Sequence, residues 1–174
     1  VYKDELEIVV DDIKVNSQNL KEIVENDNII TKNLRKSIIS QYLLICEGEG
    51  VYAKEFDILG YGNVKVFVKG FGRENSDLAT NNCIMIRYPY MKIKAITGIS
   101  NIPCSAMCII EENQLNSELK DVENPQHTDW EPKRKDDEAL RSEIRNILYQ
   151  LKKQIIDFVI EVLSSSETEE LDIE

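Results

Sequence analysis

The sequence has few of the residues from which catalytic and metal sites are usually built. Histidine occurs once in the 174 residues, at His127. No serine or cysteine lies in a glycine-framed nucleophile turn, so acyl transfer finds no support. The cysteines lack the two-residue spacing of zinc ligands, and we interpret them as buried, reduced thiols. We therefore expect no metal site. The cysteines are Cys46, Cys83, Cys104 and Cys108.

Long apolar runs and complete phosphate-binding loops are missing as well. No segment approaches the roughly 18 consecutive apolar residues of a membrane helix, so we expect a soluble chain without a membrane partner. The reduced cysteines make the cytoplasm the expected location. The segment Gly70-Phe71-Gly72 has no third glycine and no Lys-Ser/Thr pair behind it, which makes it a weak candidate for a phosphate cradle. The formal charge of −11, from 32 acidic and 21 basic residues, argues against nucleic acid as a partner of the whole chain.

The apolar pattern that is present predicts an α+β fold. Val64, Val66 and Val68 alternate with lysine and phenylalanine, which is the period of a strand with one buried face. A loop is expected between Gly50 and this strand, and another over 70–82. Together the elements predict a mainly antiparallel sheet of about four to five strands with helices on one side. Further strand candidates are residues 6–10, 13–15, 84–87, 91–97 and 106–110, and helix candidates begin near Leu20 and cover 34–45 and 114–122.

The C-terminal part of the chain predicts one long helix over about 138–163. Its apolar residues are spaced four, three, four, three and four apart, as in a coiled-coil seam. We favour packing of this seam on the chain's own sheet, and self-association as a homodimer is the alternative. Residues 164–174 are predicted to be a disordered acidic tail behind a single domain over 1–163. The seam consists of Ile144, Leu148, Leu151, Ile155, Phe158 and Val162.

Two segments resemble a known family. Residues 84–93 read IMIRYPYMKI, and a helix candidate with Leu115-Asn116 and Leu119 leads into ENPQHTDW over 123–130. In order and spacing they are similar to the I-R-x-x-x-M-x-I strand, the L-N-x-x-L helix and the E-N-P-x-H-x-x-W turn of bacterial ATP-binding proteins. Those proteins belong to the GHKL superfamily of gyrase, histidine kinases and MutL. The resemblance covers about residues 55–135, in the domain that follows the ATPase domain.

The resemblance implies a transducer domain, whose fold is similar to one ribosomal-protein domain. In such proteins a basic residue reaches into the neighbouring ATPase domain and meets the γ-phosphate, so that loss of the phosphate lets the domains reorient. Arg87 matches this position, and Lys92 and Lys94 are the less favoured candidates. A switch residue of this kind is expected to point out toward the neighbouring domain. The competing interpretation of Arg87 is an ion pair that fixes the strand.

The 123–130 motif is interpreted as structural. Asn124 and Pro125 favour a turn, and Trp130 is expected to bury its ring. His127 is expected to bond backbone groups. With Glu123 at its start, the motif would fix the passage from the sheet to the long helix and so couple them rigidly.

Taken together, these patterns predict the coupling domain of a larger ATPase that is not an enzyme on its own. The expected partner is an N-terminal ATPase domain outside the chain, which opens at Val1 and is read as an excised segment. ATP and magnesium would be bound in the intact protein, because only partial nucleotide boxes occur here. Residues 22–26 match E-x-x-x-N, but one extra residue between Asp57 and Gly60 breaks the D-x-G-x-G box. The alternative function is dimerisation or protein docking through the long helix.

Overall fold

The computed structural model describes residues 8–10, 13–16, 19–25, 40, 41, 44 and 50–171. The strands β1 (Ile8–Val10) and β2 (Ile13–Val15) pair antiparallel and are followed by the helix α1 (Leu20–Glu25), as predicted. The predicted helix 34–45 lies mostly outside the described residues, although Leu44 has helical backbone. Cys46 also lies outside them.

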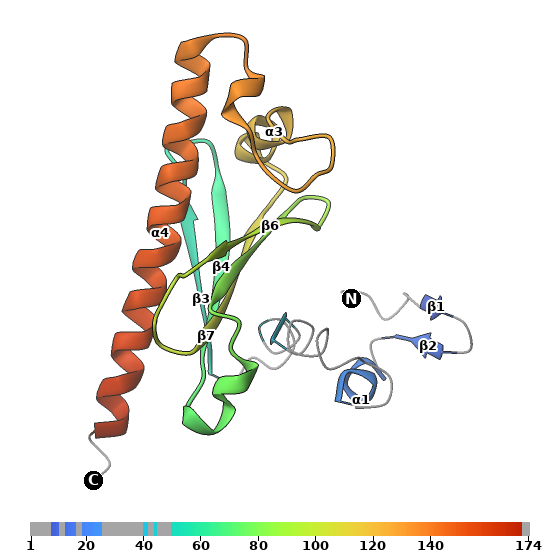
Figure 1. Cartoon of the computed structure of the whole chain (residues 1–174), viewed down its shortest axis with the longest axis vertical. Coiled ribbons are helices and arrows are strands. Elements are labelled where there is room, and N and C mark those ends of the chain that lie inside the picture. Colours follow the sequence, from blue (N-terminus) through green and yellow to red (C-terminus); the bar gives the residue numbers. More distant parts are fainter. Residues whose placement is uncertain are drawn as a thin grey trace.

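A five-stranded sheet forms the centre of the molecule (Figure 1). Its strand order is β3-β4-β7-β5-β6, and every neighbouring pair is antiparallel except β5 and β7, which run parallel. The predicted α+β class with a mainly antiparallel sheet is confirmed. The strands are β3 (Val51–Asp57), β4 (Asn63–Gly70), β5 (Asn82–Arg87), β6 (Met91–Thr97) and β7 (Cys104–Ile110).

The predicted alternation of β4 is present in the structure. Val64, Val66 and Val68 are each at most 1 % exposed and belong to the main core, because successive side chains of a strand point to opposite faces. Phe67, on the other face, packs with Met107 and Leu44 in a second, smaller cluster. Both faces of the sheet therefore carry buried apolar residues.

The strand β3 corrects the sequence-based prediction of a loop after Gly50. It forms one edge of the sheet, with Tyr52 opposite Val68 and Phe56 opposite Val64. Most of its residues are exposed, so its sequence lacks the apolar run of a central strand. The segment predicted as a loop over 70–82 also contains a 3₁₀ turn, Arg73–Leu78.

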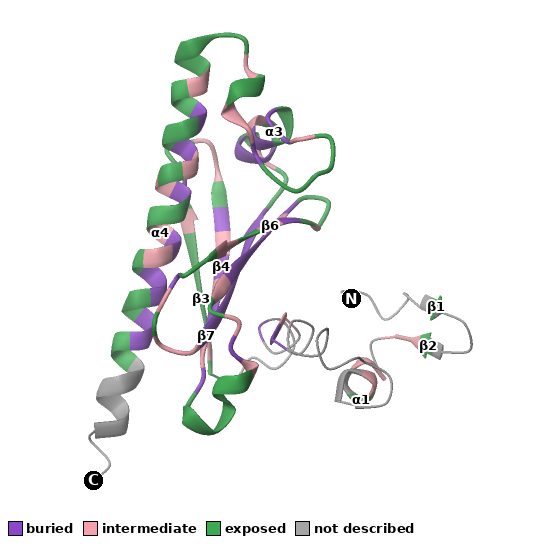
Figure 2. Cartoon of the chain, in the orientation of Figure 1, coloured by how far each residue is buried: buried purple, intermediate pink, exposed green. Residues whose placement is uncertain are grey.

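The helix α4 (Glu138–Leu171) covers one face of the sheet (Figure 1). The predicted seam faces the sheet: five of its six residues are at most 5 % exposed, and Leu148 packs against the same core (Figure 2). Packing on the chain's own sheet is therefore confirmed, and the seam offers no surface for a second copy. The helix continues past the predicted boundary at Leu163 and ends at Leu171, and residues 172–174 of the predicted tail lie outside the described residues.

Polar contacts fix the position of α4 along the sheet. Lys54 on β3 pairs with Glu161 at 2.7 Å, and the Tyr61 hydroxyl bonds the carboxylate of Glu143. None of the helices in the described ranges is long and apolar enough to cross a membrane.

Candidate functional site

The site is built where the end of β5 meets the turn that follows α3 (Gln114–Asp121), so the two motif segments of the sequence lie together. Arg87, the last residue of β5, donates from Nε to Glu123 Oε2 at 2.5 Å and from a terminal nitrogen to Glu123 Oε1 at 2.7 Å. Its other terminal nitrogen donates to the carbonyl oxygen of Tyr88 at 2.7 Å. This is the bidentate geometry that suits a guanidinium and a carboxylate.

Burial makes this ion pair a structural element. The side chains of Arg87 and Glu123 are 4 % and 3 % exposed. Burial alone would raise the pKa of Glu123, but the hydrogen bonds from Arg87 and His127 outweigh it and lower that pKa. The expectation that Arg87 points out toward a neighbouring domain is not met in this structure. Its alternative interpretation, an ion pair that fixes the strand, describes the observed geometry.

The 123–130 segment closes on itself through the side chain of Asn124. The Asn124 Oδ1 accepts the backbone N–H of Thr128 at 2.8 Å, and the Asn124 backbone N–H donates to the carbonyl of Asp129 at 2.9 Å. A β-bridge then pairs Glu123 with Trp130 across the turn. This closed turn holds the Glu123 carboxylate toward Arg87.

His127 occupies the tip of the turn with a positive φ of 55°. Its Nδ1 lies within hydrogen-bond distance of Glu123 Oε1, and its side chain is 57 % exposed. The His127 ring was expected to bond backbone groups, and the structure corrects this prediction. Its partner is the Glu123 carboxylate, which also binds Arg87. Sequence spacing of four between Glu123 and His127 is the only signal that hinted at this contact.

Trp130 fixes the turn to the main core. Its side chain is 4 % exposed as predicted, and within the described part of the chain its indole N–H has no hydrogen-bond partner. The ammonium of Lys94 lies 5.7 Å from the ring centroid and forms an ion pair with Asp129. Asp129 in turn accepts the backbone N–H of Trp130 at 2.8 Å.

The three basic candidates therefore have different environments. Arg87 is buried in its pair with Glu123, and Lys94 is held by Asp129. Lys92 is exposed on the edge strand β6, opposite Ile86 in the sheet register. Of the three, only Lys92 is an exposed residue.

The segment that resembles a D-x-G-x-G box, residues 57–62, shapes a turn. Asp57 accepts the backbone N–H of Gly60 at 2.7 Å, and the Ile58 N–H donates to the Gly62 carbonyl at 3.0 Å. These bonds shape the turn between β3 and β4, so the carboxylate is engaged inside the hairpin. In the E-x-x-x-N match over 22–26, Glu22 is exposed on α1, whereas Asn26 lies outside the described residues.

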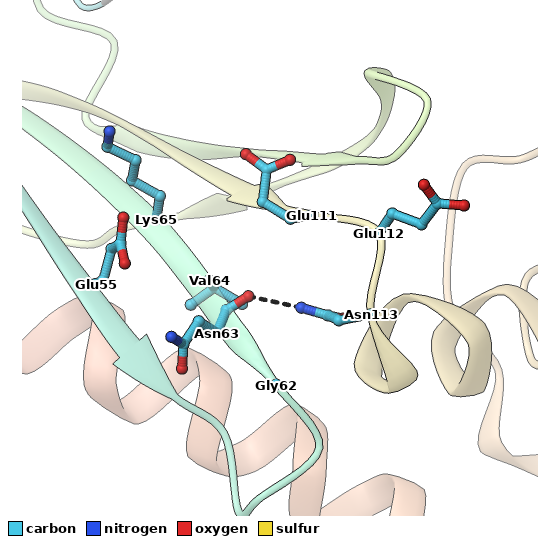
Figure 3. Close-up of a pocket in the computed structure, with 8 residues that line it drawn as sticks. All are labelled: Glu55, Gly62, Asn63, Val64, Lys65, Glu111, Glu112 and Asn113. Atoms are coloured by element: carbon cyan, nitrogen blue, oxygen red, sulfur yellow. Dashed lines mark hydrogen bonds between the residues drawn. The ribbon is translucent and has the colours of Figure 1, made fainter.

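A concavity lies between the β3–β4 hairpin, the end of β7 and the start of α3, with a volume of about 380 Å³ (Figure 3). Asn113 caps α3 and donates from Nδ2 to the carbonyl of Asn63 at 2.8 Å across it. The carboxylates that line this concavity belong to Glu55, Glu111 and Glu112, and all three residues are exposed. Among the residues that the structure describes, no three or more His, Cys, Asp or Glu side chains are grouped so that they could hold a metal ion.

The cysteine interpretation is confirmed for the three cysteines that the structure places. Cys83, Cys104 and Cys108 are buried free thiols in the main core. Burial raises the pKa of Cys104 to about 11 and raises the pKa of Cys83 and Cys108 further above the ordinary thiol range. These thiols therefore stay protonated and serve as core residues.

Acidification provides a test of the pair at this site. Because the pKa of Glu123 is lowered in the folded chain, its contribution to stability is present above its unfolded pKa of about 4.3 and is lost as the pH falls through the folded value. Glu123→Gln should therefore be clearly less stable than the parent at pH 7, and the gap should narrow below about pH 4.

Urea unfolding of both proteins at a series of pH values measures this gap. Glu74→Gln, at an exposed carboxylate, is the matched control and should show no comparable change. A gap for Glu123→Gln that stays constant from pH 7 to pH 3 would contradict an ionised buried pair.

The geometry on its own describes a rigid junction between β5, α3 and the turn that leads to α4. No protein-family model, no curated protein and no solved structure matches this chain.

Proposed function

We propose that this chain is the transducer domain of a larger ATPase, relaying the nucleotide state of a neighbouring ATPase domain to its own long helix. The observation that carries the proposal is the buried pair of Arg87 and Glu123, which joins the two segments that resemble GHKL transducers. Residues 36 positions apart in the chain, one from each motif, meet with bidentate geometry. A shared structural role accounts for both motifs at once.

A continuous set of contacts supports a relay from this junction to α4. The turn of residues 123–130 leads into the 3₁₀ turn Pro132–Arg134. Next to it, the ammonium of Lys135 lies 3.2 Å from Glu118 and 3.4 Å from Asp121 on α3. Arg141, in the first turns of α4, donates from Nε to the carbonyl of Lys135 at 2.7 Å. A displacement of β5 relative to its neighbours would therefore move the start of α4 as well.

The proposal assigns ATP and magnesium to the intact protein. The Asp57 segment is used to shape a hairpin, so the nucleotide would be held by the neighbouring domain. A basic side chain of this chain would approach the γ-phosphate, where a positive charge stabilises the transferring phosphoryl group. The exposed position of Lys92 makes it our leading candidate for that contact, ahead of Arg87 and Lys94.

The proposal predicts that Lys92→Ala, made in the protein that includes the upstream ATPase domain, lowers ATP turnover by at least tenfold. Removal of one preorganised oxyanion-hole donor raises the activation free energy by about 2.7–4 kcal/mol, and we expect loss of a positive charge at the γ-phosphate to have a comparable effect. Binding of ADP should change little, because ADP has no γ-phosphate. Steady-state turnover and ADP titration measure the two effects.

Lys120→Ala, at an exposed lysine on α3, is the matched control and should turn over ATP at the parental rate. Lys94→Ala is tested as well. If the ion pair between Lys94 and Asp129 opened, the Lys94 ammonium could make the γ-phosphate contact in place of Lys92. Parental turnover in the Lys92 and Lys94 variants, together with parental turnover per folded molecule in Arg87→Ala, would remove the phosphate contact from the proposal. Submillimolar binding of magnesium-ATP by this chain alone would replace the proposal with an independent nucleotide-binding protein.

A further inference from the structure

The outer face of α4 carries an apolar stripe that the sheet does not use. Tyr149 and Ile160 are 62 % and 54 % exposed, and Ile156 between them is half-buried. Spacings of seven and four place these three residues on one side of a helix. The core residues of α4 point the opposite way, toward the sheet (Figure 2). Figure 1 shows the helix along one side of the molecule, with its principal contacts made to β3, β4 and the 3₁₀ turn before it.

Two opposite charges lie on the same stripe. Lys153 and Asp157 are both about half exposed and form an ion pair at 2.6 Å along the helix. The 3.6-residue period places Lys153 beside Tyr149 and Ile160, and Asp157 on the same flank as Lys153. The stripe therefore combines apolar side chains with one positive and one negative group.

We propose that this stripe pairs two copies of the chain through antiparallel α4 helices. A two-fold axis between Gln154 and Ile155 would place Tyr149 opposite Ile160 of the second copy. The same axis would place the Lys153 and Asp157 side chains of both copies next to one another on one flank. An isologous contact of this kind is self-complementary, which is the usual arrangement in homodimers.

Charge decides the direction of pairing. A parallel two-fold arrangement would place this flank of the two copies on opposite sides of the contact, so neither Lys153 nor Asp157 would meet an opposite charge of the second copy. The antiparallel arrangement alternates the two signs, so each ammonium has a carboxylate of the other copy nearby. The second copy is therefore an antiparallel neighbour.

The pairing is expected to be weak and reversible, because each copy contributes a small set of apolar side chains. The proposal rests on the surface of α4 alone and does not depend on the transducer function. It uses the outer face of the helix, whereas the seam of Ile144 to Val162 stays buried in each copy.

Sedimentation velocity of this chain over a wide range of concentrations tests the pairing. The parent should show a monomer–dimer equilibrium, and Ile160→Asp should weaken the dimer at least tenfold while the melting temperature stays close to the parental value. Because Ile160 is exposed, this variant is expected to fold. A parent that remains monomeric at the highest soluble concentration would overturn the proposal.

Charge exchange tests the orientation. Lys153→Glu alone and Asp157→Lys alone should each weaken the dimer, and the double exchange should restore it, because the alternating signs are then regained. Lys152→Glu makes the same change of charge on the opposite flank of the stripe. It should weaken the dimer less than Lys153→Glu does. A dimer that all these substitutions leave unchanged uses another surface, and the proposal is then wrong.

Discussion

Arg87→Ala is expected to lower the free energy of unfolding of this chain by about 3–5 kcal/mol. The substitution leaves the carboxylate of Glu123 in a site where its side chain is 3 % exposed, without the guanidinium that balances its charge. His127 remains beside Glu123, but its ring supplies a single hydrogen bond, whereas Arg87 supplies two. Chemical denaturation at pH 7, with far-UV circular dichroism as the probe, measures the loss.

A double variant separates the cost of an unpaired charge from the cost of lost packing. Arg87→Met combined with Glu123→Leu removes both charges and keeps much of the volume, so it should be far less harmful than Arg87→Ala. A loss below about 1 kcal/mol for Arg87→Ala, the size expected at an exposed surface position, would return Arg87 to the role of an outward switch residue. Turnover per folded molecule in the proposed larger ATPase then decides whether Arg87 contacts the nucleotide.

The central elements were predictable because one face of each is buried. The alternation of Val64, Val66 and Val68 has the period of a strand, and all three are core residues. The three-to-four spacing along α4 likewise predicted both a helix and the side that packs. The spacing of apolar residues predicts an element when only one of its faces is buried, and this holds for β4 and α4.

The edge strand β3 was missed for the converse reason. Lys54 and Glu55 interrupt its apolar residues, and only one side of the strand has a neighbour in the sheet. A weaker signal was present, since Tyr52 and Phe56 alternate with Lys54 on the side that faces α4. Phe56 packs edge-to-face on Phe158, with ring centroids 5.7 Å apart. Tyr52 and Phe56 lie four residues apart and so share one face of a strand, which was the evidence for β3.

The partners within the site could not be derived from spacing. Arg87 and Glu123 are both in recognisable motifs, yet their contact depends on β7 lying between β4 and β5. With β7 in this position, β5 and β7 run parallel. Arg87 then lies opposite Ile110, close to the start of α3. A sequence of local elements does not specify this order, because the crossover is a property of the whole sheet. The resemblance supplied the residues, and the topology supplied their contact.

Trp130→Ala is expected to destabilise the chain by about 3–5 kcal/mol, because a large buried ring is removed and the surrounding core closes only partly over the space. The ring is 4 % exposed and belongs to the main core together with Ile144 and Leu119. It also lies beneath the ammonium of Lys94, whose ion pair with Asp129 would lose its support. Guanidinium unfolding followed by far-UV circular dichroism measures the effect without relying on tryptophan fluorescence.

Trp130→Phe is the matched control for the size of the cavity. Phenylalanine retains an aromatic ring for the core and for Lys94, and it removes an indole N–H that has no partner within the described residues. It should therefore cost clearly less than the alanine variant. If both variants fall below about 1 kcal/mol, the ring contributes little to folding. The turn of residues 123–130 would then be held by its own hydrogen bonds and by Arg87, and Trp130 would be available as a contact for the neighbouring domain.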